Sequence, residues 1–391
     1  MKTRTHSSFL ILGIFLLGAC MRAPITSIPS MINSIAKSIG VAPTSLGILT
    51  TLPLICFGLF SPLVPKISSR LGNEWTIALT ALVLVIGSYL RIFNQSMLFV
   101  GTILVGIAIT FINVLLPALI TENMPTRIGA MTSLYILSMA IFSSIGAGIS
   151  APIAQAINWQ FVIKILTFMA LALFIFWLPN LRFNRRGTNE TKEKSASPWL
   201  NKTAWLLLLY FGLSSFIFYT LVAWLPTIAI NAGISANTAS LLAGLFQLAS
   251  VPPSFFIPVL AEKLNNRAPL VWGAGISTII GLIGILIPIH SVIYYVILNI
   301  ILGLATSATF SLLMTLISLK TRTSAETSSL SGMTQSLGYL IAAVGPVLTG
   351  SLQSSTNSWT SSLILMIVIT IAFTILGSMG ERQKFVFNEK K

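Results

Sequence analysis

The chain has 391 residues, of which 55% are hydrophobic and 8% are charged, and its mean hydropathy is +0.91. Soluble domains carry about 25% charged residues, so this composition excludes an ordinary soluble protein. It predicts an all-α polytopic membrane protein with the lipid bilayer as its partner. The formal net charge is +15, but no basic patch is interleaved with aromatic residues, so we expect no nucleic-acid partner.

Twelve apolar stretches follow one another along the chain, each long enough for a membrane-spanning helix of about 20 residues. They cover residues 8–36, 44–64, 75–93, 97–120, 128–154, 159–178, 203–230, 238–260, 269–288, 291–319, 324–352 and 359–378. Most lysines and arginines fall in alternate connections, and the positive-inside rule then places both termini in the cytoplasm. We therefore predict a multi-pass protein of the cell membrane that works as a monomer.

One connection, residues 180–202, is long, polar and charged. We expect it to be a cytoplasmic linker between two six-helix halves, residues 1–179 and 203–379, with residues 380–391 as a cytoplasmic tail. The halves also repeat in sequence, because Gly40 aligns with Gly233 and, at the same offset, Pro65 aligns with Pro258. Two parallel repeats of this kind resemble the fold of major facilitator transporters, in which the substrate site lies between the halves near the bilayer midplane.

Arg22 lies inside the first apolar stretch, fourteen residues after Ser8, which is about 21 Å along a helix. The hydrocarbon core is about 30 Å thick, so the guanidinium cannot easily reach the near interface. An arginine at that depth costs at least about 2.5 kcal/mol on insertion scales and faces the bundle interior or a water-filled path. Since Arg22, Thr26 and Asn33 share a helix face, we predict a substrate path along it. The alternative is a structural arginine that binds backbone carbonyls beside the prolines.

The segment from Met21 to Pro29 reads Met-Arg-Ala-Pro-Ile-Thr-Ser-Ile-Pro. Together with Leu52-Pro53, Tyr89-Leu90-Arg91 and Ala223-Trp224-Leu225-Pro226, it resembles the cyanate and 2-nitroimidazole permease family of the major facilitator superfamily. The resemblance implies a transporter for a small anion or a nitro-heterocycle. It also points to Arg22 as the anion ligand, a role that suits the planar, permanently charged guanidinium. The family usually has asparagine before the Met-Arg pair, where this chain has Cys20.

Polar and aromatic residues of several apolar stretches are candidates to reach the same cavity. The predicted substrate-binding residues are Arg22, Thr26, Asn113, Tyr135, Tyr219, Trp224, Gln247, Gln335 and Tyr339. Aromatic rings beside an arginine clamp a flat anion or heterocycle, and Gln335 and Tyr339 share a helix face. Two alternatives remain open, because Asn113 could instead hold a neighbouring helix and Trp224 could belong to an interfacial aromatic belt.

Arg91 ends the third apolar stretch on the outer side of the membrane. It is a candidate for steering anions into the outer mouth of the path. The alternative is an arginine that faces the lipid headgroups.

The connection from Pro65 to Glu74 resembles the cytoplasmic signature of the superfamily, of which Arg70 and Gly72 remain while Ser69 replaces the acid. The copy in the second half keeps an acid and a base as Glu262 and Lys263. The resemblance implies a latch that closes the inner side, formed by Arg70, Gly72, Glu262 and Lys263. The alternative is ordinary positive-inside charge next to a turn glycine.

The chain contains no aspartate, and its eight glutamates fall in connections or at helix ends. Proton relays and sites for cations usually need a carboxylate in the membrane, so this pattern disfavours a carboxylate-coupled antiporter of cations. Metal-ligand spacing, a nucleophile–base set and a phosphate loop are also missing, so we expect neither an enzyme nor a cofactor or metal site. The sequence predicts a transporter of a small-molecule anion or nitro-heterocycle that works by alternating access. A multidrug efflux transporter of the same superfamily and a non-transporting sensor are the alternatives.

Overall fold

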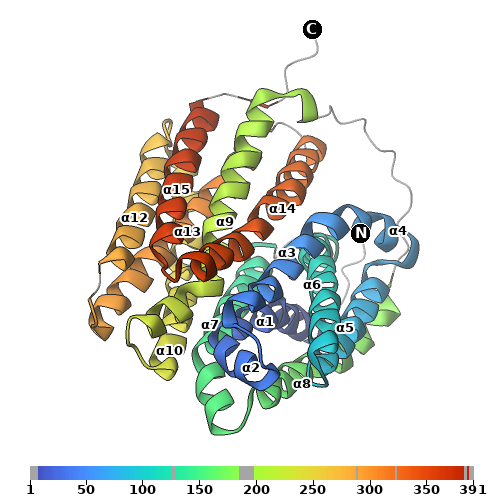
Figure 1. Cartoon of the computed structure of the whole chain (residues 1–391). Coiled ribbons are helices and arrows are strands. Elements are labelled where there is room, and N and C mark those ends of the chain that lie inside the picture. The colour runs from blue at the N-terminus through green and yellow to red at the C-terminus, as the bar shows by residue number, and fades with distance from the viewer. Residues whose placement is uncertain are drawn as a thin grey trace.

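The computed structural model describes residues 8–124, 128–184, 198–287, 289–321, 324–382 and 385–386. In this part of the chain all regular elements are helices (Figure 1). Twelve helical segments are long and apolar enough to cross a membrane. The predicted all-α polytopic fold is therefore confirmed.

The first half contains eight α-helices. They are α1 (Ser8–Ser30), α2 (Ile32–Ile39), α3 (Ile48–Phe60), α4 (Val64–Leu71), α5 (Asn73–Leu90), α6 (Gln95–Asn123), α7 (Ile128–Ala156) and α8 (Trp159–Trp177). The predicted stretch 8–36 is interrupted at Met31, between α1 and α2. The interruption follows Pro29, which cannot donate a backbone hydrogen bond inside a helix.

The second half contributes seven α-helices. They are α9 (Lys202–Asn231), α10 (Ala236–Ala249), α11 (Val251–Lys263), α12 (Ala268–Leu286), α13 (Val292–Leu319), α14 (Ser324–Thr356) and α15 (Thr360–Arg382). The eighth span is divided at Ser250, just before two consecutive prolines at the start of α11, which explains why one predicted stretch yields two helices.

Several helices start at a polar side chain that accepts a hydrogen bond from the first turn. Asn94 accepts from the Met97 N–H at 2.9 Å before α6, and Asn158 accepts from the Phe161 N–H at 2.8 Å before α8. Asn201 does the same for α9 at the Thr203 N–H, at 2.8 Å. Such caps satisfy backbone donors that the helix itself leaves without partners, so these residues fix where the spans begin.

The sequence repeat extends to the backbone. Gly40, which ends α2, has a φ of +73°, and its aligned residue Gly233, which follows α9, has a φ of +86°. Only glycine adopts this left-handed conformation without strain. In both halves, therefore, a glycine with a positive φ lies in the turn from the first span to the second.

The two ends of the bundle differ in how the halves meet. We call the end at which α6, α11 and α13 finish and α9 begins the linker face, and the other end the opposite face. Toward the opposite face, Ser144 of α7 donates to the Gly244 carbonyl of α10 at 2.8 Å. Likewise, Thr51 of α3 donates to the Ala343 carbonyl of α14 at 3.0 Å. These contacts close the molecule on the opposite face.

Candidate functional site

A cavity of about 570 Å³ lies between the two halves. Its wall comes from α1, α3, α6 and α7 on one side and from α9, α10, α11, α13 and α14 on the other. The lining reaches Glu262 and Ser318, which lie near the linker-face ends of α11 and α13. The cavity thus extends to the linker face, while the α7–α10 and α3–α14 contacts seal the opposite face.

Eight of the nine predicted substrate residues line this cavity. They are Arg22, Thr26, Asn113, Tyr135, Tyr219, Gln247, Gln335 and Tyr339. These residues lie on six helices from both halves. The fold therefore brings together side chains that are more than 300 positions apart in the sequence, although contact with a substrate stays a prediction.

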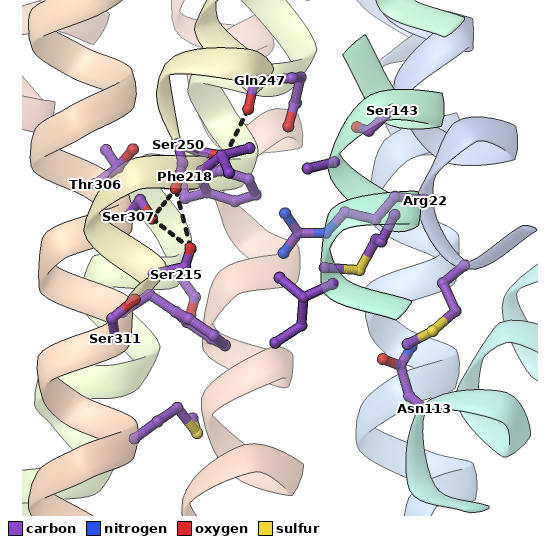
Figure 2. A pocket seen from close by; sticks show the side chains of 18 of the residues that line it. Arg22, Asn113, Ser143, Ser215, Phe218, Gln247, Ser250, Thr306, Ser307 and Ser311 are labelled. Carbon is purple, nitrogen blue, oxygen red and sulfur yellow. Dashed lines mark hydrogen bonds between the residues drawn. The ribbon is translucent and has the colours of Figure 1, made fainter. Parts of the chain in front are cut away.

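Arg22 projects from α1 toward the second half (Figure 2). Its guanidinium carbon lies 5.0 Å from the centre of the Phe218 ring, within the range of a cation–π interaction. In the part of the chain that the structure describes, Arg22 forms no ion pair with a carboxylate. A planar anionic group entering the cavity can therefore use the guanidinium without displacing an acidic side chain.

The helix that carries Arg22 packs very closely on α7. A Cβ atom added to Gly18 would lie 2.5 Å from the Tyr135 carbonyl oxygen, so only glycine fits there. One turn beyond Arg22, the Thr26 hydroxyl lies 3.3 Å from the Ser143 carbonyl oxygen of α7 and 3.2 Å from the Arg22 carbonyl oxygen. Thr26 therefore holds α1 against α7 while it also lines the cavity.

Aromatic rings form a wall beside Arg22. The Tyr339 ring packs edge-to-face against Phe57, Phe211 and Tyr219, with centroid separations of 5.2, 5.1 and 6.2 Å. Phe218 in turn packs edge-to-face on Tyr219 at 5.1 Å, and the Tyr219 side chain interacts with the Arg22 guanidinium. Such arrangements fix ring orientation, so the cavity presents rigid, flat surfaces next to its charge.

Trp224 corrects one sequence prediction. Its side chain is 0% exposed and lies in the seal of the opposite face, neither in the cavity nor in an interfacial belt. The indole N–H donates to the Pro346 carbonyl at 2.8 Å, and the ring packs beside Gly47 and Gly350, at which added Cβ atoms would lie 2.6 and 2.7 Å away. These two glycines make the room that the indole occupies.

The structure also places Arg91 in neither of the two environments that its sequence position suggested. The side chain is 1% exposed, so in this conformation it faces neither an outer mouth nor a headgroup layer. Its Nη1 donates to the Pro24 carbonyl of α1 at 3.0 Å. Arg91 therefore braces the helix that carries Arg22, from a position outside the cavity.

The predicted latch residues lie at the linker face. Gly72 has a φ of +89°, and the side chain of Asn184 fills the space beside it by donating to the Leu71 carbonyl at 2.8 Å. The side chains of Arg70, Glu262 and Lys263 are exposed, and Glu262 lines the cavity mouth. Their action as a latch stays a prediction.

The structure reveals a charged cluster in the second half that the sequence analysis missed. Arg267 pairs with Glu381 at 3.7 Å, and the Lys320 ammonium donates to the Glu381 carbonyl at 2.7 Å. Burial lowers the pKa of the Lys320 ammonium, and this effect outweighs the opposing charge of Glu381. The cluster ties together the linker-face ends of α12, α13 and α15.

Hydroxyl groups of the second half were also missed as cavity residues. They include Ser214, Ser215, Ser250, Ser254, Thr306, Ser307, Ser311, Thr315 and Ser318. Within α13, the spacing of Ser307, Ser311, Thr315 and Ser318 is 4, 4 and 3 residues, which puts them on one helix face. That periodicity was the available sequence signal.

In the described part of the chain, twelve helical segments of membrane-spanning length and composition surround a cavity that opens to one face, as in a membrane transporter. More particularly, the chain belongs to the Major Facilitator Superfamily, whose family model matches residues 10–343. It is therefore a transporter and not an enzyme.

Three relatives support this assignment. The chain is 37% identical to an uncharacterized transporter, YycB, of Bacillus subtilis (strain 168), over 99% of this chain and 97% of the relative. It is 30% identical to a 2-nitroimidazole transporter of Escherichia coli (strain K12), over 96% of each chain. It is 23% identical to the cyanate transport protein CynX of the same organism, over 90% of this chain and 91% of the relative. The family resemblance read from the arginine motif is thus confirmed.

The fold is similar to that of a bacterial homologue of the human lysosomal transporter Spinster, solved in an inward-facing and unoccupied conformation. The two structures superpose with a TM-score of 0.78, covering 98% of this chain and 99% of the other, at 15% sequence identity. This likeness concerns the fold alone.

Proposed function

We propose that the chain is a secondary transporter that moves a small anion or a nitro-heterocycle across the cell membrane, with Arg22 as the anion ligand. The observation that carries this proposal is the guanidinium of Arg22 in a central cavity without an ion-pair partner among the described residues. Arg22 is half-buried, and a charge on the wall of a membrane cavity is costly without a polar partner. An anionic substrate group supplies a counter-charge, and the oxygens of a nitro group supply hydrogen-bond acceptors for the guanidinium. The names of two relatives, a 2-nitroimidazole transporter and a cyanate transport protein, agree with this chemistry.

Alternating access is the transport mechanism that we propose. The opposite face is closed by a small set of contacts between α7 and α10 and between α3 and α14, whereas the cavity reaches the linker face. If the linker face is cytoplasmic, as the positive charges indicate, this conformation is open to the cytoplasm. Rocking of one half on the other would exchange the open and closed ends around Arg22.

The proposal is tested by thermal-shift measurements on the purified protein with cyanate, 2-nitroimidazole and a panel of cationic drugs. A ligand that binds the folded state raises the melting temperature by mass action. We expect cyanate or 2-nitroimidazole to do so in the native protein, and both Arg22→Ala and Arg22→Lys to lose the shift while they still melt cooperatively.

The control is Arg382→Ala, which removes an exposed arginine at the linker-face end of α15 that does not line the cavity. This variant should respond like the native protein. A panel in which only the cationic drugs raise the melting temperature would favour a multidrug exporter, and an unchanged response in Arg22→Ala would make the arginine structural.

A further inference from the structure

Three buried polar side chains of the second half face the cavity without protein partners. Gln247 of α10, Ser215 of α9 and Ser311 of α13 are exposed by 3%, 4% and 7%, and all three line the cavity. None of these side chains hydrogen-bonds to another described residue. Figure 2 shows them around the space into which Arg22 points from the first half.

Their neighbours on the same wall are different, because their hydroxyl groups are already used. The Thr306 hydroxyl donates to the Leu302 carbonyl at 2.7 Å, and the Ser250 hydroxyl donates to the Gln247 carbonyl at 2.6 Å. The polar atoms of Gln247, Ser215 and Ser311 are not enclosed by protein but open on the cavity. Only water or a ligand in the cavity can complete their hydrogen bonds. The free amide and the two free hydroxyls therefore point to a ligand that completes their hydrogen bonds.

We propose that Gln247, Ser215 and Ser311 form a charge-neutral subsite for the far end of a planar organic substrate whose anionic or nitro end lies on Arg22. This inference rests on the proposed function and specifies its substrate class. The glutamine amide offers two donors and one acceptor, and each serine hydroxyl is both donor and acceptor. The matching substrate end carries a donor and an acceptor of its own, as the N–H and the bare ring nitrogen of an azole do.

The subsite also ranks the candidate substrates. Cyanate is an anion without a hydrogen-bond donor, so it can satisfy Arg22 but leaves the carbonyl oxygen of the Gln247 amide without a partner. A flat heteroaromatic compound carries further hydrogen-bonding groups for Gln247 beyond the group that pairs with Arg22, and its flat faces suit a cavity whose wall includes Phe218 and Tyr219. Planar heteroaromatic compounds with a ring N–H are therefore the preferred class.

The experiment compares two nitro compounds of similar shape, 2-nitroimidazole and 2-nitrothiophene, of which the second lacks both ring nitrogens. Dissociation constants are measured by calorimetry for the full-length native protein and for Gln247→Leu, Thr306→Val and Arg22→Ala. We expect the native protein to bind 2-nitroimidazole at least about 10-fold more tightly than 2-nitrothiophene, since sites built to hydrogen-bond a group reject analogues that lack it. Gln247→Leu should reduce this ratio to about 2-fold or less by weakening only 2-nitroimidazole.

Thr306→Val is the matched control. It removes a hydroxyl from the same wall, but one that is already bonded within its own helix, so the native ratio should remain. Melting curves establish that each variant is folded. If Gln247→Leu does not fold, Ser311→Ala takes its place and should lower the ratio at least about 2-fold.

The outcomes separate this inference from the proposed function beneath it. A native ratio that survives in Gln247→Leu overturns the subsite, and the proposed function still stands if Arg22→Ala loses both compounds. Equal binding of both compounds by the native protein also overturns the subsite. Native-like binding of both compounds by Arg22→Ala, or no binding by the native protein, overturns the subsite together with the role of Arg22.

Discussion

The two halves of the molecule repeat the same helices but supply different chemistry to the cavity. At the offset that aligns Gly40 with Gly233, Arg22 of α1 corresponds to Ser215 of α9. Both side chains line the cavity, yet the first is a charge and the second a hydroxyl. The difference shows that a duplicated scaffold can hold a single ionic anchor on one side and a neutral, hydrogen-bonding wall on the other.

The seams that hold these two helices differ as well. On α1 the small residue is Gly18, which lets the α7 backbone approach closely at Tyr135. The corresponding residue of α9 is Phe211, and the small residue is on the partner helix, where a Cβ atom added to Gly338 would lie 2.1 Å from the Phe211 ring. The same close approach is thus built with the glycine on opposite members of the pair.

The largest expected effect comes from the charge itself. Arg22→Ala should weaken the binding of 2-nitroimidazole by about 10-fold to 100-fold, because a hydrogen bond to a charged group contributes about 1.5–3 kcal/mol. Ser215→Ala, the change at the corresponding position, should weaken it by about 5-fold or less. Calorimetry on the two variants checks the comparison, and equal losses would show that the two halves contribute alike.

The next effect concerns the α1–α7 seam. Gly18→Ala should lower the free energy of unfolding by about 2 kcal/mol, since the added methyl meets a backbone oxygen that cannot move aside. Gly338→Ala should cost a similar amount, because the Phe211 ring that it meets is fully buried and packed on Tyr339. The measurement is the melting temperature in detergent. Gly332→Ala is the control, with no atom within 4 Å of the added Cβ, and a loss as large as that of Gly18→Ala would refute the steric explanation.

A smaller effect is expected at the seal of the opposite face. Trp224→Phe keeps an aromatic ring but removes the hydrogen bond to the Pro346 carbonyl, which contributes about 1 kcal/mol. We expect a decrease of a few degrees in melting temperature and unchanged affinity for 2-nitroimidazole. A loss of affinity without a loss of stability would place Trp224 in the substrate site after all.

The smallest effect is a pH dependence at the linker face of the second half. Burial lowers the pKa of Lys320 in the folded protein below its ordinary value of 10.5. At a pH between the folded and the unfolded pKa, the unfolded chain therefore binds more protons than the folded one. The free energy of unfolding should therefore rise as the pH increases through this window. Lys320→Met should remove that part of the rise. Chemical denaturation at pH 8 to 10 measures it, and parallel profiles for the two proteins would contradict the assignment.

Much of the architecture could be predicted because long apolar stretches and one deeply placed arginine leave few alternatives in a bilayer. Eight of the nine substrate candidates line the cavity for the same reason, since polar side chains in such helices face the interior. The position of Trp224 could not be predicted, because the room for its ring comes from Gly47 and Gly350 on two other helices. Arg91 ends a span, where exposure is the usual expectation, and only the tertiary contact with Pro24 reverses it.

The hydroxyl groups on the wall of the second half escaped prediction for another reason. Ser250 and Ser311 look alike in the sequence, but the Ser250 hydroxyl donates to the Gln247 carbonyl of α10, whereas the Ser311 hydroxyl does not hydrogen-bond to any described residue. Local backbone bonding of this kind is common for serine and threonine in helices. Side-chain rotamers and neighbouring residues decide which hydroxyls remain available for a ligand, and the spacing of residues in the sequence predicts neither.

Among the described residues, the hydrogen bonds that close the opposite face join uncharged groups, as those of Ser144 with Gly244 and of Thr51 with Ala343 illustrate. Dissolved ions screen interactions between charges, but they have little to act on in a seal made of hydroxyl and carbonyl groups. The balance between open and closed forms at this end should therefore change little between dilute buffer and molar sodium chloride. Any loss of substrate affinity on adding sodium chloride would then report on the interaction between the substrate and Arg22, through screening or through competition by chloride, and not on the seal.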